Sequence, residues 1–189
     1  GVIMIAVVSL YLAHGINRRT TIALASTLIT LGLAMALSVW FVSLAKLSGA
    51  GSEEAIYAQT GVAGFINLKG LLLAGIIIGV LGVLDDITTA QAAVVVELLK
   101  ANPQLGVGEL YRRALSVGRE HIASLVNTLV LAYVGASLPL FLLFTANKEY
   151  GFWVIANGEF LAEEIIRTLV GSSTLVLAVP ITTILAAYW

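Results

Sequence analysis

The feature that most constrains this chain is the apolar stretch at residues 68–100, which carries Asp85 and Asp86 near its centre. At about 1.5 Å per residue, a helix over this stretch is longer than the roughly 30 Å hydrocarbon core of a bilayer. Asp85 and Asp86 are the only aspartates in the 189 residues. An aspartate at the centre of a membrane helix costs about 2.5 to 3.5 kcal/mol on insertion scales. Two adjacent aspartates must therefore be offset by polar partners, by water or by neutralisation.

One face of the helix predicted at 68–100 is small and polar. At about 100° per residue, this small-residue stripe consists of Gly75, Gly79, Gly82, Asp86, Thr89, Ala90, Ala93 and Glu97. Small residues let membrane helices approach closely, so we expect the stripe to face protein and not lipid. Asp85 lies about 100° away, at the flank of the stripe. Asp86 is therefore predicted to be the better placed of the two carboxylates.

The composition indicates an integral membrane protein. Hydrophobic residues make up 59% of the chain, charged residues 11%, and the mean hydropathy is +1.01. This favours an all-α, polytopic bundle of transmembrane helices that contacts the lipid bilayer. The net charge of −1 argues against a nucleic-acid partner. With no cysteine, and with His14 and His121 too few and too far apart, we predict neither a cofactor nor a metal site.

Hydropathy divides the chain into about five apolar segments. The segments are 1–14, 21–47, 68–100, 122–144 and 165–189. No Gly/Ser-rich linker separates them, so we expect residues 1–189 to form one transmembrane domain. The first segment is too short to span a bilayer, which predicts that the chain is a fragment whose N-terminal part is missing.

Basic residues predict the sidedness of the loops. Arg18 and Arg19 follow the first segment, and Arg112 and Arg113 follow the third. By the positive-inside rule, the loops at Arg18 and Arg112 are predicted to be cytoplasmic in a multi-pass protein of the cell membrane. In residues 107–121, apolar residues recur at helical spacing on one face and arginines lie on the opposite face. This pattern predicts an amphipathic cytoplasmic helix lying against the membrane. Arg167 falls at the edge of an outer loop, and no Lys or Arg is predicted deep inside a span.

The last two spans carry polar residues of their own. A stripe in the fourth span includes Thr128 and Gly135, with Asn127 beside it, and the fifth span includes Gly171 and Thr174. Serine, threonine and glycine in membrane helices most often serve helix packing, which is the role expected for Gly75, Gly79, Gly82, Gly135 and Gly171. An amide at depth, such as that of Asn127, is expected to have a specific partner.

The chain resembles a known group of bacterial membrane proteins. The segments GVLDDITTAQAAVVVELL and REHIASLVNTLVLAYVGASLPLFLLF closely resemble the YibE/F-like family, over nearly the whole chain. More distantly, the glycine-rich run before Asp85, the segment HIASLVNTLV and the segment GSSTLVLAVP are similar to the membrane half of SecF-type export proteins and RND efflux pumps. That likeness implies that Asp85 and Asp86 are coupling carboxylates faced by Asn127, Thr128 and Thr174. The Lys and Arg that accompany the RND aspartates have no counterpart here.

Three functional hypotheses follow. The leading one is a transport or export subunit that uses Asp85 and Asp86 for proton or cation coupling, supported by Thr89, Asn127, Thr128 and Thr174, in a homo-oligomer or with a related membrane subunit. The alternative is a structural or assembly subunit in which the aspartates only form hydrogen bonds between helices. An intramembrane aspartyl protease is disfavoured, because such enzymes carry their carboxylates on two separate helices. We therefore expect no enzymatic activity.

Overall fold

The computed structural model describes residues 1–52, 55–57, 66–146, 153–154 and 157–188. Its helices, in chain order, are α1 (Val2–His14), α2 (Arg18–Leu44), α4 (Leu68–Ala101), α5 (Val107–Ala146) and α7 (Glu159–Tyr188). Four of them, α2, α4, α5 and α7, are long and apolar enough to cross a membrane, whereas α1 is apolar but shorter. The predicted fold class, an all-α bundle of membrane-spanning helices, is confirmed.

Local sequence explains where the helices begin and end. The side chain of Asn17 accepts a hydrogen bond from the Thr20 N–H at the start of α2, and Asn67 does the same for Gly70 at the start of α4. Gly15, between α1 and α2, has a φ of 73°, a conformation that glycine adopts without a steric penalty. These signals place the turns at the ends of apolar runs.

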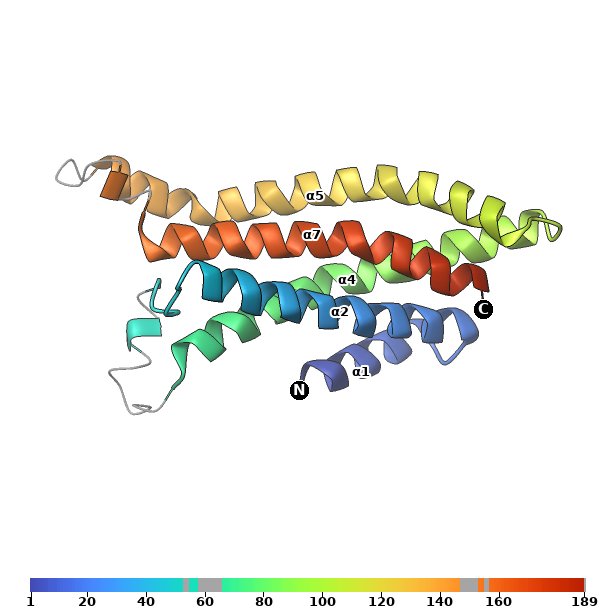
Figure 1. Ribbon diagram of the computed structural model, residues 1–189, viewed down its shortest axis with the longest axis horizontal. Helices are drawn as coiled ribbons and strands as arrows, with labels where there is room; N and C mark the ends of the chain where they lie inside the picture. The colour runs from blue at the N-terminus through green and yellow to red at the C-terminus, as the bar shows by residue number, and fades with distance from the viewer. Residues whose placement is uncertain (53–54, 58–65, 147–152, 155–156, 189) are drawn as a thin grey trace.

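The core lies where α2, α4 and α7 pack side by side (Figure 1). Leu84 and Ile87 of α4 and Leu175 of α7 are almost completely buried there. Helix α5 lies along α7, and α1 covers part of α2 and α4 (Figure 1). The outer surface of the bundle keeps large exposed side chains such as Leu33 and Val39 of α2. These surfaces are suited to contact with lipid, and the protein is a multi-pass membrane protein.

The predicted helix on the membrane surface is instead the first part of α5. Helix α5 is continuous from Val107 to Ala146, and its first part packs onto the bundle. Leu110 and Ala114 are buried against Val95 of α4, whereas Val107 and Val117 are exposed. Leu110, Ala114 and Gly118 recur every four residues, so they form one line along the helix. This line packs on protein, and the amphipathic segment predicted here continues directly into the fourth span.

Helix α7 begins earlier than hydropathy predicted. It starts at Glu159. The charged residues in its first turns lower the hydropathy of the segment, and for this reason the span was predicted to start only at residue 165. Arg167 therefore lies inside this helix, and its side chain is only 28% exposed. Because the helix begins at Glu159 and not near residue 165, Arg167 lies about two turns inside it, further from the loop than predicted.

A buried glutamine joins three helices near the end where α7 finishes. The Gln91 side-chain N–H group of α4 donates to the Ala114 carbonyl of α5 at 3.0 Å and to Thr183 Oγ1 of α7 at 2.7 Å. Gly118 of α5 packs directly against this amide. A Cβ at position 118 would collide with Val179 and come within 2.7 Å of Gln91 Oε1. The three-helix contact therefore requires a residue without a side chain at this position.

We expect Gly118→Ala to destabilise the protein by about 1 to 3 kcal/mol, because the new methyl group overpacks the contact between Gln91 and Val179. The midpoint of thermal unfolding in detergent measures the effect. Gly135→Ala is the matched control on the same helix, because a Cβ there meets nothing within 4 Å. It should be neutral or slightly stabilising, since alanine favours a helix more than glycine does. Equal losses for the two variants would contradict the assigned role of Gly118.

Candidate functional site

Asp85 lies where α1 meets the middle of α4. Its side chain is half-buried, and Asp85 Oδ2 accepts a hydrogen bond of 3.2 Å from Ser9 Oγ of α1. The other oxygen, Oδ1, is buried and has no hydrogen-bond partner in the described part of the chain. An ionised carboxylate can only accept hydrogen bonds, so this oxygen has unused capacity for a proton, a water molecule or a cation.

The two aspartates differ in exposure in the opposite order to that predicted. Asp86 is exposed, as are Gly79 and Gly82 of the small-residue stripe, whereas Gly75 is half-buried. The bulky residues on the opposite side of α4 fill the interface with α2 and α7 and so leave the stripe outside. Within this chain, the central part of the stripe is therefore not covered by the described residues. In the described part of the chain, Asp85 and not Asp86 is the carboxylate that forms a hydrogen bond with a neighbouring helix.

The threonines next to the aspartates bind backbone and not carboxylate. Thr89 Oγ1 lies 2.8 Å from the carbonyl of Asp85 and 3.1 Å from that of Asp86. Thr88, which sequence reasoning missed, is fully buried and shares a 2.8 Å hydrogen bond with Thr27 of α2. This places a polar contact between α2 and α4 one turn from Asp85. The sequence signal for this contact is weak, because it consists of one threonine in each of two apolar spans.

The other predicted polar residues do not gather around the aspartates. Asn127 and Thr128 are exposed on α5, and Thr128 Oγ1 donates to the Ser124 carbonyl at 3.0 Å. Thr174 is buried in α7, where its hydroxyl donates to the Val170 carbonyl at 2.6 Å. Among the described residues, no hydrogen bond connects any of these three side chains to Asp85 or Asp86.

The predicted packing glycines fall into two groups. Gly171 is buried, and a Cβ there would come within 3.2 Å of Leu129 of α5, which fits a close contact between α5 and α7. Cβ atoms at Gly75 and Gly79 would meet only Arg167 and the Tyr133 hydroxyl, at 3.7 and 3.9 Å. Gly82 and Gly135 have nothing within 4 Å of such an atom. Inside this chain, Gly171 makes the closest contact of the predicted set.

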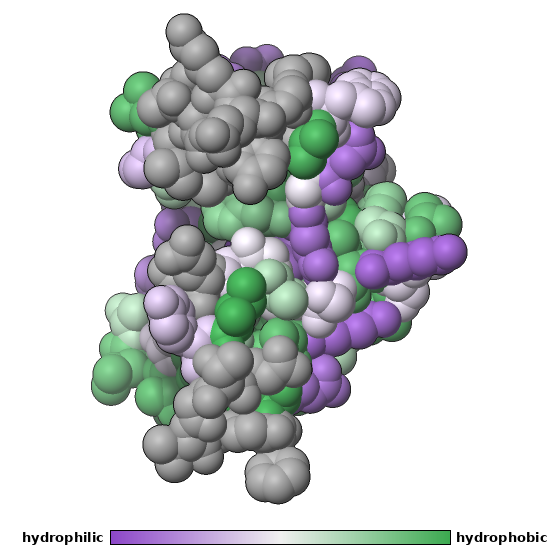
Figure 2. Space-filling model, turned by 90° about the vertical axis from the view of Figure 1, so that its left-hand side faces the viewer, coloured by the Kyte–Doolittle hydropathy of each residue, from purple (hydrophilic) through white to green (hydrophobic). Residues whose placement is uncertain are grey.

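Two glutamates at the start of α7 anchor the turn that follows α2. Glu159 accepts hydrogen bonds from the Ser48 hydroxyl at 2.9 Å and from the Gly49 N–H at 2.8 Å. Glu163, only 7% exposed, accepts from the Gly51 N–H at 3.1 Å. Gly49 has a φ of +87° and packs against the Leu68 carbonyl, so it tolerates no side chain. Figure 2 shows this end of the molecule, where hydrophilic side chains gather on one flank.

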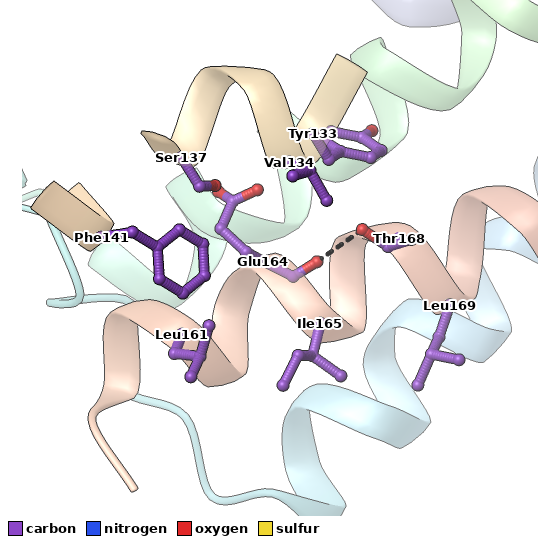
Figure 3. A pocket seen from close by; sticks show the side chains of 9 residues that line it. All are labelled: Tyr133, Val134, Ser137, Phe141, Leu161, Glu164, Ile165, Thr168 and Leu169. Carbon is purple, nitrogen blue, oxygen red and sulfur yellow. Dashed lines mark hydrogen bonds between the residues drawn. The ribbon is translucent and has the colours of Figure 1, made fainter. Parts of the chain in front are cut away.

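A small cavity lies between α5 and α7 near this end. Its volume is about 230 Å³, and mainly apolar side chains line it, together with Glu164, Ser137 and Tyr133. Figure 3 shows the Glu164 side chain extending from α7 toward Ser137 of α5. Glu164 Oε1 also lies 3.4 Å from Arg167 Nε. The cavity is smaller than the roughly 300 to 1,000 Å³ of typical ligand pockets.

Among the described residues, no three His, Asp or Glu side chains come close enough to hold a metal ion. Arg167 of α7 approaches α4 at Gly75. Gly75 is ten residues before Asp85, which corresponds to about 15 Å along a helix. Among the described residues, no ion pair reaches either aspartate, and we take the pair as the candidate functional site.

Comparison with known proteins identifies the family but no closer relative. No curated protein and no solved structure matches the chain. The more distant likeness to SecF-type and RND proteins is not shown by these comparisons. The family described as YibE/F-like protein matches residues 1–189, which confirms the resemblance seen in the sequence. Because the match covers the whole sequence, the chain belongs to the YibE/F-like protein family.

Proposed function

We propose that this chain is a transport or export subunit in which Asp85 and Asp86 respond to a proton or a cation. The observation that carries the proposal is the buried Asp85 Oδ1, which has no hydrogen-bond partner in the described part of the chain. A buried polar oxygen without a partner is costly, and a bound proton or cation would supply that partner. No basic side chain forms an ion pair with either aspartate among the described residues.

The contact between Ser9 and Asp85 suggests how such a change acts on the fold. Neutralising Asp85 weakens the charge-assisted hydrogen bond from Ser9 and so changes how well α1 packs on α4. A ligand that favours one packing over the other shifts the population of the two states. In this proposal, the proton or cation is that ligand. The resulting movement of α1 against α4 drives the transport of the substrate.

The exposed Asp86 supports a membrane partner. Asp86 and Gly82 lie together on the open face of α4, in the middle of an apolar helix. Lipid chains do not solvate a carboxylate, so this face is covered by protein or water. We propose that a second copy of this chain or a related membrane subunit covers it. Asn127 and Thr128, exposed on α5, offer a second polar surface for such a partner.

The proposal also assigns one end of the helix bundle to the cytoplasm. The turn at Arg18 and the connection from α4 to α5 lie at the same end of the bundle (Figure 1). By the positive-inside rule, we assign this end to the cytoplasm in a cell membrane. No enzymatic role is proposed. The rival function is a structural or assembly subunit, in which the Asp85 carboxylate serves only as a hydrogen-bond acceptor for Ser9.

Labelling of single cysteines tests the sidedness, since the chain has no cysteine background. Tyr57→Cys and Ser116→Cys place thiols at exposed positions at opposite ends of the bundle. An impermeant maleimide added to intact cells should label position 57 and not position 116. Permeabilised cells, in which both positions should react, are the control. The reverse pattern in intact cells would overturn the orientation.

Carboxylate exchange tests the coupling role. Asp85→Asn keeps an oxygen that can accept from Ser9 but removes the titrating group. We therefore expect Asp85→Asn to fold normally and to lose the carboxyl band that changes with pH in difference infrared spectra of the reconstituted protein. Asp86→Asn should reduce the same signal, because it removes one of the two adjacent carboxyl groups.

The control for this experiment is Glu97→Gln on the same helix, where the exposed Glu97 pairs with Lys100 at 2.7 Å. Glu97→Gln should leave the aspartate band unchanged. Growth of a deletion strain provides the functional readout. If the Asp85→Asn/Asp86→Asn double variant restores growth as fully as the unaltered chain does, the structural rival is correct.

Cross-linking tests the partner. Gly82→Cys places a thiol beside Asp86 on the open face, where a Cβ has nothing within 4 Å. A short bismaleimide should convert this variant in native membranes into dimers, or into adducts with one other membrane protein. Met35→Cys, exposed on α2, is the control and should stay monomeric. Only monomers at position 82 would contradict a protein partner on this face.

A further inference from the structure

A groove opens where the turn between α1 and α2 meets the ends of α4 and α7. Its volume is about 440 Å³. Arg18, Arg19 and Lys100 form a basic rim, and Ile22, Val96 and Leu99 form an apolar floor. The groove is therefore amphipathic, with cations at one edge and aliphatic side chains below them. It lies far from the aspartates and has no part in the proposed coupling function.

The rim carries uncompensated positive charge. Lys100 Nζ lies 2.7 Å from Glu97 Oε1, and both side chains are well exposed. Arg18 and Arg19 make no ion pair with any carboxylate that the structure describes. Both stand in the first turn of α2, where the helix dipole disfavours a cation. Three cations against one carboxylate leave the groove with excess positive charge that an anion would offset.

The position of the groove fits the headgroup layer of a membrane. Helix α2 has 27 residues, which corresponds to about 40 Å and matches the roughly 40 to 45 Å of a bilayer with its headgroups. Arg18 and Arg19, at its first turn, therefore lie at headgroup depth. Val96 and Leu99 of α4 continue from there toward the apolar middle of the bundle.

We propose that this groove binds an anionic glycerophospholipid. The phosphate contacts Arg18, Arg19 and Lys100, and an acyl chain lies along Ile22, Val96 and Leu99. Basic pockets between membrane helices on the cytoplasmic side recognise anionic headgroups in this way. A free phosphate ion would use the rim but not the floor, and a zwitterionic lipid would use the floor without satisfying the rim.

Native mass spectrometry of the full chain in a neutral detergent tests the proposal, with dioleoyl phosphatidylglycerol, dioleoyl phosphatidylcholine and inorganic phosphate as probes. We expect phosphatidylglycerol to bind most tightly. Arg18→Gln/Arg19→Gln should weaken its binding by roughly 30-fold, the effect of removing two interfacial cations. Phosphatidylcholine binding should change little.

The matched control is Arg112→Gln/Arg113→Gln, which removes the same charge at the same end. These two arginines already pair with Glu109, at 2.7 and 2.6 Å, and do not line the groove. Phosphatidylglycerol binding should fall by less than about threefold in this variant, since its contribution is long-range and screened. Equal losses in the two double variants would overturn the site in favour of general surface charge.

Two further results separate the possible ligands. Inorganic phosphate that binds as tightly as phosphatidylglycerol would show that the acyl floor plays no part and would overturn the lipid assignment. If Arg18→Gln/Arg19→Gln does not fold, a photoactivatable phosphatidylglycerol applied to the unaltered chain replaces it. Labelled peptides that contain Ile22 or Leu99 would support the groove, and labels confined to other segments would contradict it.

Discussion

The structure depends on one constraint, which is that polar groups inside the bundle must find partners without water. Most hydroxyl groups meet it within their own helix. Ser26 and Thr30 of α2 donate to the carbonyls of Ile22 and Ser26, and Thr183 of α7 donates to Val179. A carboxylate cannot use this solution, because it has no proton to donate and a helix offers it no free N–H group in mid-span. Asp85 therefore depends on another helix, and the structure supplies one donor, Ser9.

The same constraint gives the two aspartates different surroundings. Neighbouring residues on a helix point about 100° apart, so Asp85 turns toward α1 while Asp86 stays on the open face of α4. One carboxylate is thus tied to a helix of its own chain, and the other is available to whatever covers the bundle. A pair of adjacent acids can in this way connect an internal contact with an external one.

Hydropathy predicted the existence of the helices well, and it predicted α4 almost to the residue, as 68–100 against Leu68–Ala101. It did not predict which face of α4 is buried. Small residues allow close helix packing and bulky aliphatic residues fill a core, so the sequence favours protein contact for both faces of α4. In the structure, the bulky Leu84 and Ile87 fill the core. The role of Glu159 could not be predicted from the sequence either, because its partners Ser48 and Gly49 are remote in sequence. The continuity of α5 had a local signal, the spacing of Leu110, Ala114 and Gly118, which the apolar-versus-basic pattern of the segment concealed.

The Gln91 contact has a mechanical consequence for α5. Ala114 and Gly118 fix this helix at one level, because sliding it by a turn would break the bond from Gln91 and drive a side chain into Val179. Beyond this level, α5 continues for 28 residues to Ala146, or about 42 Å. A second close contact, between Leu129 and Gly171 of α7, lies eleven residues further along, so α5 is held at two levels. The 17 residues beyond Leu129, about 26 Å of helix, have the most freedom, and a tilt of about 5° there moves the end of α5 by about 2 Å.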